Sequence, residues 1–213
     1  MTYLILIALS YFSAGTATRV HDAMLCAFSI KHPTTYLGNP EMTRDAFFVC
    51  MEMVAESRRQ RVPPFWTLSV AYTETRWRHG LVGSLGEIGP LQIMPKYYCP
   101  ADPTTPYPKG SAKMCGDRTV YYGVKALKNH LLKYGNEDLA TCHYKQGNTC
   151  GPEGREAAAR VRRKTMALRG AWHRTKARRN KLQPLWSPIA ATSKRGRLRK
   201  NRMVRPPAGR RSM

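Results

Sequence analysis

PPFWTLSVAYTE, at residues 63–74, is the stretch from which the fold is predicted. Two prolines suit the start of a helix, where missing amide donors cost nothing, and the apolar residues after them leave one face to be buried. Glu74 then falls at the C-terminal end of the predicted helix. The helix dipole makes an ionised carboxylate costlier there, and burial beside Tyr72 and Trp77 would add to that cost. The placement therefore suits a carboxyl group that donates a proton as a general acid.

A glutamate followed by Arg76 and Arg78 is also typical of a solvated helix end, so the helix alone does not decide between the two interpretations. The next segment, GEIGPLQIMP at residues 86–95, favours the functional one. Its two glycines can take positive backbone angles or allow close approach of the chain. Its closing proline, Pro95, is expected to end whatever element begins within the segment.

Together with ATCHYKQG at residues 140–147, these segments resemble the motifs of soluble-type lytic transglycosylases, which are lysozyme-like enzymes. That family carries a Glu-Ser pair, then Gly-x-x-Gly-Leu-Met-Gln-Ile-Met-Pro, then Ala-Tyr-Asn-Ala-Gly. Glu74 and Thr75 match the pair, with the hydroxyl kept. The matches to the later motifs are Gly86, Gly89, Gln92, Ile93, Met94, Pro95, Tyr144 and Gly147. The resemblance covers about residues 63–168, roughly half of the chain.

The resemblance implies a single mainly α-helical, lysozyme-like catalytic domain that cleaves peptidoglycan. Glu74 would act twice: it protonates the oxygen between N-acetylmuramic acid and N-acetylglucosamine, then takes the proton of the muramyl sugar's own primary hydroxyl, which closes an anhydro ring. No water, metal or other cofactor is consumed. The implied substrate-binding residues are Gln92, Tyr144, Thr75 and Ile93, although Gln92 and Tyr144 also fit buried polar packing. Such enzymes occur in phage particles and in secretion or conjugation systems.

Three of the departures from the family pattern bear on the interpretation of the site. Pro90 and Leu91 replace Leu-Met, which keeps the strip apolar, and Lys145 replaces the usual Asn. An ammonium close to Glu74 would favour the ionised carboxylate and oppose an acid role. Either Lys145 points away, or the site is tuned by other means. Glu87 is the candidate second carboxylate for a hydrolase, although a glutamate in a glycine-flanked turn is more often exposed or structural.

Two alternative functions stay open. A hydrolytic muramidase on the same scaffold, similar to goose-type lysozymes, would leave reducing ends in place of anhydro ends. A catalytically inactive cationic protein of a virion or envelope would keep the fold and use its charge for binding. The joint presence of Glu74, Gln92 and Tyr144 favours an enzyme over the inactive protein. Analysis of the cleavage products separates the transglycosylase from the hydrolase.

The net charge of +23 is unevenly distributed. Every Asp and Glu lies at or before Glu156, whereas about half of the Lys and Arg residues follow it. This split predicts a catalytic domain at residues 19–170 and a disordered or loosely helical basic tail at residues 171–213. Such a tail would attract an anionic envelope polymer, a membrane surface, or nucleic acid if the protein is packaged in a virion. Trp172 and Trp186 are interpreted as aromatic residues of this tail.

The N-terminal residues indicate export. Residues 3–12, YLILIALSYF, form a short apolar core, and small residues follow it. The pattern predicts a signal peptide or a short N-terminal anchor at residues 1–18, with cleavage after Ala17 in the first case. The expected location is the periplasm or cell envelope, or a virion.

Six cysteines lie beyond this segment, an even number that fits an oxidising compartment. They permit many pairings, and the sequential one is favoured because it would close the insertion at residues 101–114 and brace the segment that carries Tyr144. The favoured pairs are Cys26 with Cys50, Cys99 with Cys115, and Cys142 with Cys150. Zinc binding by Cys142, His143 and Cys150 is the competing interpretation, but they lack paired Cys-x-x-Cys spacing, so no metal is predicted.

Apolar periodicity predicts a helical set, and no alternating run indicates a strand. Gly135 is the expected stop of one helix, whose inward residues include Leu127, Leu131 and Leu132. The resemblance allows a small β element after Glu74. The predicted helices span residues 41–59, 63–74, 119–134, 137–144 and 153–168. The predicted class is therefore mainly α.

Overall fold

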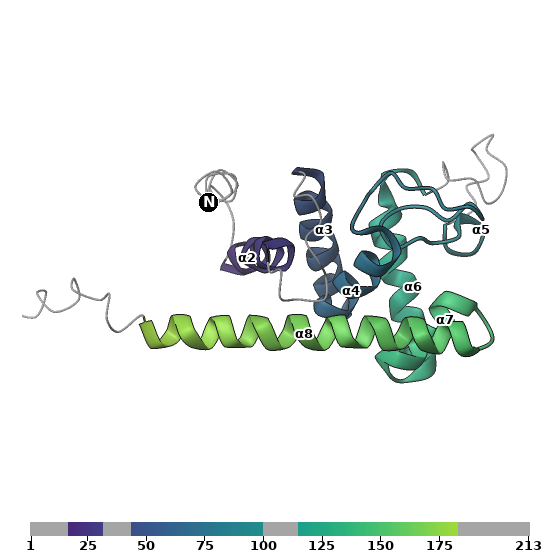
Figure 1. The fold of residues 1–213 in the computed structure, drawn as a ribbon. Coiled ribbons are helices and arrows are strands. Elements are labelled where there is room, and N and C mark those ends of the chain that lie inside the picture. The colour runs from purple at the N-terminus through teal and green to yellow at the C-terminus, as the bar shows by residue number, and fades with distance from the viewer. Residues whose placement is uncertain (1–16, 32–43, 100–114, 183–213) are drawn as a thin grey trace, which may run out of the picture. The chain divides into compact units, whose positions relative to one another are not determined.

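The computed structural model describes residues 17–31, 44–99 and 115–182. Residues 1–16 of the predicted leader at 1–18, the insertion at 101–114 and residues 183–213 of the predicted tail at 171–213 lie outside these ranges. The described residues are mainly helical, which confirms the predicted class (Figure 1). The helices are α2 (Ala17–Lys31), α3 (Arg44–Gln60), α4 (Pro64–Thr75), α5 (Pro95–Tyr98), the 3-10 helix η3 (Gly116–Arg118), α6 (Thr119–Tyr134), α7 (Glu137–Gln146) and α8 (Pro152–Leu182).

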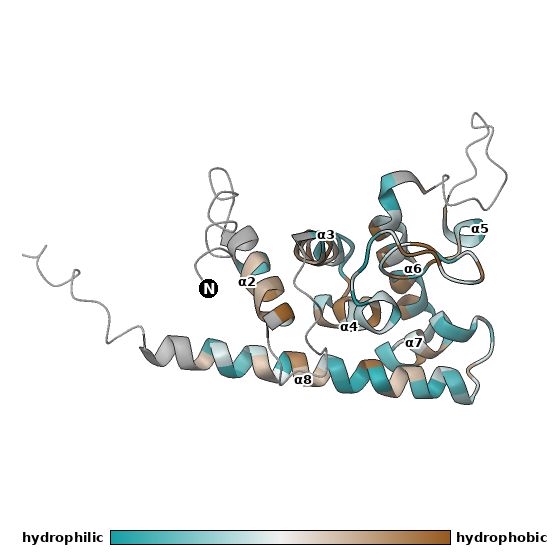
Figure 2. Cartoon of the chain, turned by 45° about the horizontal axis from the view of Figure 1, so that its top comes forward, coloured by the Kyte–Doolittle hydropathy of each residue, from teal (hydrophilic) through white to brown (hydrophobic). Residues whose placement is uncertain are grey.

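Helix α4 is the most apolar of these helices and supplies much of the core (Figure 2). It begins at Pro64 because a proline at the first helical position gives up no hydrogen bond. Helix α3 packs against α2, α4 and α6, and α6 packs against α7. Trp66 of α4 is fully buried, and its Nε1 donates to Oγ1 of Thr141 in α7 at 2.9 Å. This bond connects the helix that carries Glu74 to the one that carries Tyr144.

Helix α6 occupies the predicted range, and α3 and α4 end within one residue of theirs. Gly135 caps α6 with φ of 80°, and its N–H donates to the carbonyl of Leu131 at 2.9 Å. Leu132, predicted to face inward, is instead 74% exposed. Leu131 and Leu132 are consecutive, and successive helical residues lie about 100° apart, so only Leu131 reaches the core. Residues 41–43 of the predicted first helix lie outside the described part of the chain.

Two N-terminal features differ from the prediction. Helix α2 was not expected, yet Leu25, Cys26 and Ile30 are buried in the core. The helix begins at Ala17, the position after which cleavage is predicted. No helix in the described ranges has both the length and the apolar character needed to cross a membrane.

Helix α8 is longer than the helix predicted at its position. The expected helix at residues 153–168 is one part of α8, which runs on to Leu182. Figure 2 shows hydrophilic residues over much of its length. The extension forms because residues 171–182 contain Ala, Arg and Lys, which are strong helix formers even where they bury little apolar surface.

Trp172 belongs to the core and not to a solvated tail. It is 8% exposed, and the preceding Ala171 is 4% exposed. The indole meets the ring of Phe28 edge to face, with centroids 5.4 Å apart, and that of His21 in the same manner at 5.2 Å. Trp172 therefore packs with residues of the predicted domain, although it lies beyond the predicted boundary at residue 170.

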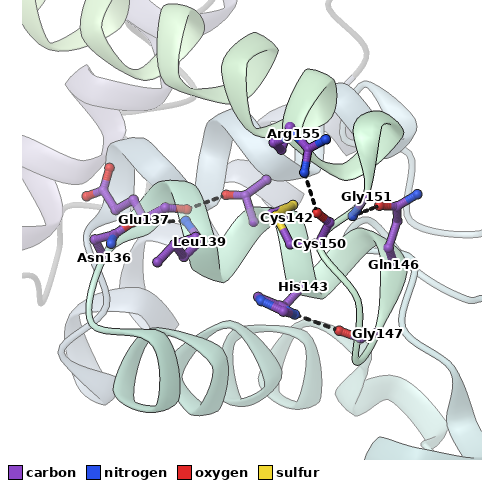
Figure 3. Close-up of a disulfide and its surroundings, with 11 residues drawn as sticks. Asn136, Glu137, Leu139, Cys142, His143, Gln146, Gly147, Cys150, Gly151 and Arg155 are labelled. Carbon is purple, nitrogen blue, oxygen red and sulfur yellow. Dashed lines mark hydrogen bonds between the residues drawn. A yellow bond between two sulfur atoms is a disulfide. The ribbon is translucent and has the colours of Figure 1, made fainter.

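The three predicted disulfides are confirmed: Cys26 with Cys50, Cys99 with Cys115, and Cys142 with Cys150. Figure 3 shows the third, which joins the end of α7 to the segment before α8. Arg155 donates to the carbonyl of Cys150 at 2.8 Å, and Gln146 accepts from the N–H of Gly151 at 2.7 Å. The sulfurs of Cys142 and Cys150 bond to each other, so in this structure they are not the thiolates that a zinc site requires.

Candidate active site

Glu74 lies in the last turn of α4, and its side chain is 13% exposed. The helix ends because Arg76 takes a left-handed conformation with φ of 53°, and its N–H donates to the carbonyl of Tyr72 at 3.0 Å. Trp77 follows with φ of 63°. Its indole is buried, donates to the carbonyl of Leu68 at 2.9 Å and meets the ring of Tyr72 edge to face. The turn is therefore anchored beneath the carboxylate by an aromatic pair.

The segment at residues 86–95 folds as a compact turn with a small β element. Ile88 pairs with Ile93 through two backbone hydrogen bonds of 2.9 and 3.0 Å, and a second antiparallel bridge joins Val82 to Ile88. Gly89 has φ of 72°, and a Cβ there would lie 2.7 Å from Cβ of Thr119, so only glycine fits. Pro95 begins helix α5 instead of ending an element, because proline is well suited to a first helical position.

Three side-chain contacts bring the three sequence motifs together. Thr75, next to Glu74, donates from Oγ1 to the carbonyl of Pro90 at 3.0 Å. Tyr144 of α7 donates from its hydroxyl to the carbonyl of Leu91 at 2.5 Å. Lys145 of α7 places Nζ 2.9 Å from Oε2 of Glu74. The end of α4, the 86–95 turn and the end of α7 thus contact one another, and α7 supplies the ammonium that meets the carboxylate of Glu74.

Lys145 therefore points toward Glu74, which excludes the first of the two arrangements expected from the sequence. Its side chain is 47% exposed, so the ammonium is partly solvated while the carboxylate beside it is largely buried. The ion pair joins the last turn of α4 to the last turn of α7.

The predicted substrate-binding residues are mainly structural in this arrangement. Thr75 is 2% exposed and Ile93 is 1% exposed, so neither reaches a ligand in solution. Gln92 has φ of 49°, and its Nε2 donates to the carbonyls of Leu81 and Gly89 at 3.2 and 3.0 Å. Thr75 and Gln92 thus make hydrogen bonds that hold the turn at residues 86–95. The roles of Thr75, Gln92 and Ile93 as glycan contacts stay predictions.

Tyr144 is held as a neutral hydrogen-bond donor. Burial, the charge of Glu74 and the neighbouring Tyr98 raise the pKa of Tyr144 well above its ordinary value. The hydroxyl therefore keeps its proton throughout the pH range in which a carboxyl group titrates, and it directs that proton to Leu91.

His130 and Tyr98 adjoin Tyr144 and were not identified from the sequence. Nε2 of His130 lies 3.0 Å from the hydroxyl of Tyr98, and the imidazole meets the ring of Tyr144 edge to face at 5.6 Å. Burial, His143 and Lys133 lower the pKa of His130, so the ring is neutral at pH 7. His130 follows the buried Leu127 by three positions in α6, so helical periodicity was the signal that could have placed it on the inner face.

Glu87, the candidate second carboxylate, accepts a hydrogen bond within its own turn. Its Oε2 accepts the backbone N–H of Leu85 at 3.0 Å, and a Cβ on Gly83 would collide with the same oxygen. This is the structural placement that its glycine-flanked position predicts.

Comparisons with protein-family models, curated proteins and solved structures found no match to the chain. Chemical interpretation of the site therefore depends on its own geometry. The site offers one largely buried carboxyl group that can give and take a proton, an ammonium 2.9 Å away that can compensate its charge, and a phenol that stays neutral.

Proposed function

We propose that the protein is a lytic transglycosylase that cleaves the bond between N-acetylmuramic acid and N-acetylglucosamine in peptidoglycan. The convergence of the three motifs on Glu74 supports this proposal most strongly. Nζ of Lys145 lies 2.9 Å from Oε2 of Glu74, although the two residues are far apart in the sequence. The hydroxyl of Tyr144 donates to the carbonyl of Leu91 in the 86–95 turn. The helical fold is consistent with a lysozyme-like domain, which is part of the same proposal.

In the proposed reaction Glu74 acts first as an acid and then as a base. It donates its proton to the glycosidic oxygen as the bond to the muramyl anomeric carbon breaks. The primary hydroxyl of the muramyl sugar then bonds to that carbon and returns its proton to Glu74, which closes the anhydro ring. Between the two steps Glu74 is a carboxylate, and Lys145 at 2.9 Å would stabilise it. One carboxyl group is sufficient because water does not take part.

Location and partners are part of the same proposal. Three disulfides are consistent with an oxidising compartment, and hence with export to the periplasm or cell envelope or with a virion. The cationic residues after Glu156 would attract an anionic envelope polymer, a membrane surface or, in a virion, nucleic acid. Most of that sequence lies outside the described residues.

One observation favours an inactive cationic protein as the second candidate. Lys145 and Glu74 already satisfy each other as an ion pair, as in a purely structural contact. In that case the protein would bind anionic envelopes without cleaving glycan.

The test is digestion of isolated sacculi by the purified protein, with mass spectrometry of the released fragments. We expect anhydromuramyl ends. Release of fragments with reducing ends alone would identify a hydrolytic muramidase. Binding of the protein to sacculi with no release of fragments at any pH from about 4 to about 8, roughly the range in which enzymatic acids and bases operate, would favour the inactive cationic protein.

Lys145→Asn is expected to slow cleavage. The variant lacks the ammonium that would stabilise the carboxylate left on Glu74 as the glycosidic bond breaks, so initial rates should fall on the order of two- to fivefold, the effect of a partly exposed ion pair. The measurement is the initial rate of sacculus solubilisation by variant and wild type. Equal rates would contradict the role given to Lys145.

A further inference from the structure

His130 of α6 lies between a tyrosine of α5 and a tyrosine of α7. Its Nε2 lies 3.0 Å from the hydroxyl of Tyr98, the last residue of α5. Its ring meets that of Tyr144 in α7 edge to face, with centroids 5.6 Å apart. One partly buried side chain thus connects α5 to α7, and the proposed reaction gives it no part.

The Tyr98 end of this chain of contacts is held by a disulfide. Cys99, the next residue, bonds to Cys115, which lies before α6 in the chain. The end of α5 is therefore tied to the approach to α6 by a covalent bond, and to α6 itself by the contact between Tyr98 and His130. His130 thus has a fixed neighbour on this side.

The Tyr144 end leads to the carboxylate. The hydroxyl of Tyr144 donates to the carbonyl of Leu91 at 2.5 Å. Lys145, the next residue of α7, places Nζ 2.9 Å from Oε2 of Glu74. The position of the Tyr144 ring affects where this ammonium lies, because the two side chains belong to consecutive residues of one helix. A residue that holds the ring can therefore influence Glu74 from a distance.

We propose that His130 is a positioning residue of the candidate active site: through its contacts with Tyr98 and Tyr144 it holds the end of α7, and with it Lys145, against Glu74. It acts through Tyr144 and takes no part in proton transfer. The inference rests on the proposed function, because the alignment matters to a rate only if the site cleaves glycan.

The contacts suit a neutral imidazole. Nδ1 of His130 is buried without a hydrogen-bond partner among the described residues, so the N–H that an imidazolium carries there would stay unpaired. Burial, and then the charges of His143 and Lys133, lower the pKa of His130. The neutral ring therefore contributes stability above about pH 6.5, the ordinary pKa of histidine, and this contribution is lost as the pH falls. The titratable side chains around the ring are Tyr98 of α5, His143 and Tyr144 of α7, and Lys133 and Tyr134 of α6.

Two substitutions separate the hydrogen bond of His130 from its ring. His130→Gln keeps a polar group near the position of Nε2 and does not titrate, whereas His130→Phe keeps an aromatic ring and loses the bond to Tyr98. His143→Gln is the matched control. It makes the same change in the neighbouring histidine, whose ring stacks on that of Tyr134 with centroids 3.8 Å apart. The measurements are kcat and KM across pH, with thermal unfolding curves to verify the fold.

At pH 7 we expect kcat of His130→Phe to lie about tenfold below that of wild type, the effect of one lost hydrogen bond, with little change in KM. His130→Gln and His143→Gln should stay within about threefold of wild type, because the first keeps the bond and the second leaves it untouched. The ratio of wild-type kcat to His130→Gln kcat should fall about tenfold as His130 becomes protonated, since Glu74 is common to both proteins. A ratio that stays constant, or an equal loss in His143→Gln, would overturn the positioning role.

A second measurement is independent of cleavage. Proteins with isotope-labelled histidine and tyrosine rings are titrated by NMR in the Glu74→Gln background, where that side chain no longer titrates. We expect the Tyr144 ring signals to shift with the midpoint of the His130 Cε1 signal, and this step to vanish in His130→Gln but persist in His143→Gln. Tyr144 signals that stay constant while His130 titrates overturn the positioning role alone, even if the protein cleaves glycan. Coupled titration without any cleavage overturns the enzymatic proposal alone.

Discussion

Glu74→Gln is expected to reduce the release of glycan fragments from sacculi by about 10³-fold, within the range that general acid and base groups contribute. The amide has nearly the same size as the carboxyl group but cannot donate or take a proton at the required step. The fold should persist although the side chain is only 13% exposed, because Glu74 is not part of the apolar core. The amide oxygen of the variant can still accept a hydrogen bond from Lys145. Initial rates of fragment release and thermal unfolding curves provide the measurements.

Glu87→Gln is the matched control. The same chemical change is then made in a carboxylate that accepts from Leu85 in the adjacent turn. If Glu74 alone serves as acid and base, the rate of Glu87→Gln should lie within about threefold of the wild-type rate, as expected of a turn residue that takes no part in the chemical step. A hydrolase that uses a second carboxylate would lose activity with either change. Substantial cleavage by Glu74→Gln itself would be incompatible with the proposed chemistry.

Replacing both cysteines of the third disulfide, Cys142→Ser with Cys150→Ser, is expected to destabilise the protein and to impair the site. Loss of loop closure over a separation of 8 residues should lower the free energy of unfolding by about 2.5 kcal/mol. Gly154 of α8 packs so closely that a Cβ there would lie 2.8 Å from Sγ of Cys142. The bridge therefore positions the end of α7, which carries Tyr144 and Lys145, against the start of α8.

The comparison is Cys26→Ser with Cys50→Ser. That bridge spans 24 residues, so its loss should lower the free energy of unfolding by about 3.5 kcal/mol, the larger effect. It joins α2 to α3 and carries no residue of the site. Urea unfolding curves and activity, the latter measured at a temperature at which circular dichroism shows both variants folded, should therefore rank the two in opposite orders. The same order in both measurements would show that the third bridge has no special role at the site.

The parts of the fold that were predicted correctly depend on local signals. The end of α6 follows from Gly135, which takes the left-handed conformation that few other residues tolerate. The start of α4 follows from its prolines. The disulfide pairs follow from short separations along the chain. In each case the structural feature is determined by residues that lie near one another in the sequence.

The parts that were missed depend on partners distant in sequence. Trp172 stands among cations and has the composition of a tail, and only its contact with Phe28 places it in the core. Lys145 and Glu74 are 71 positions apart, so spacing could not reveal whether the ammonium faces the carboxylate. Thr75 matches a motif position, but its burial against Pro90 is a property of the assembled turn.

The three bridges each close a local loop, and none joins the part of the chain that contains Glu74 to the part that contains Lys145. Their alignment therefore relies on noncovalent contacts such as the bond from Trp66 to Thr141. Gentle warming can separate the two halves of the site while every sulfur stays correctly paired. Such a protein would lose activity reversibly, and on cooling it would reassemble without any need for an oxidant or an isomerase.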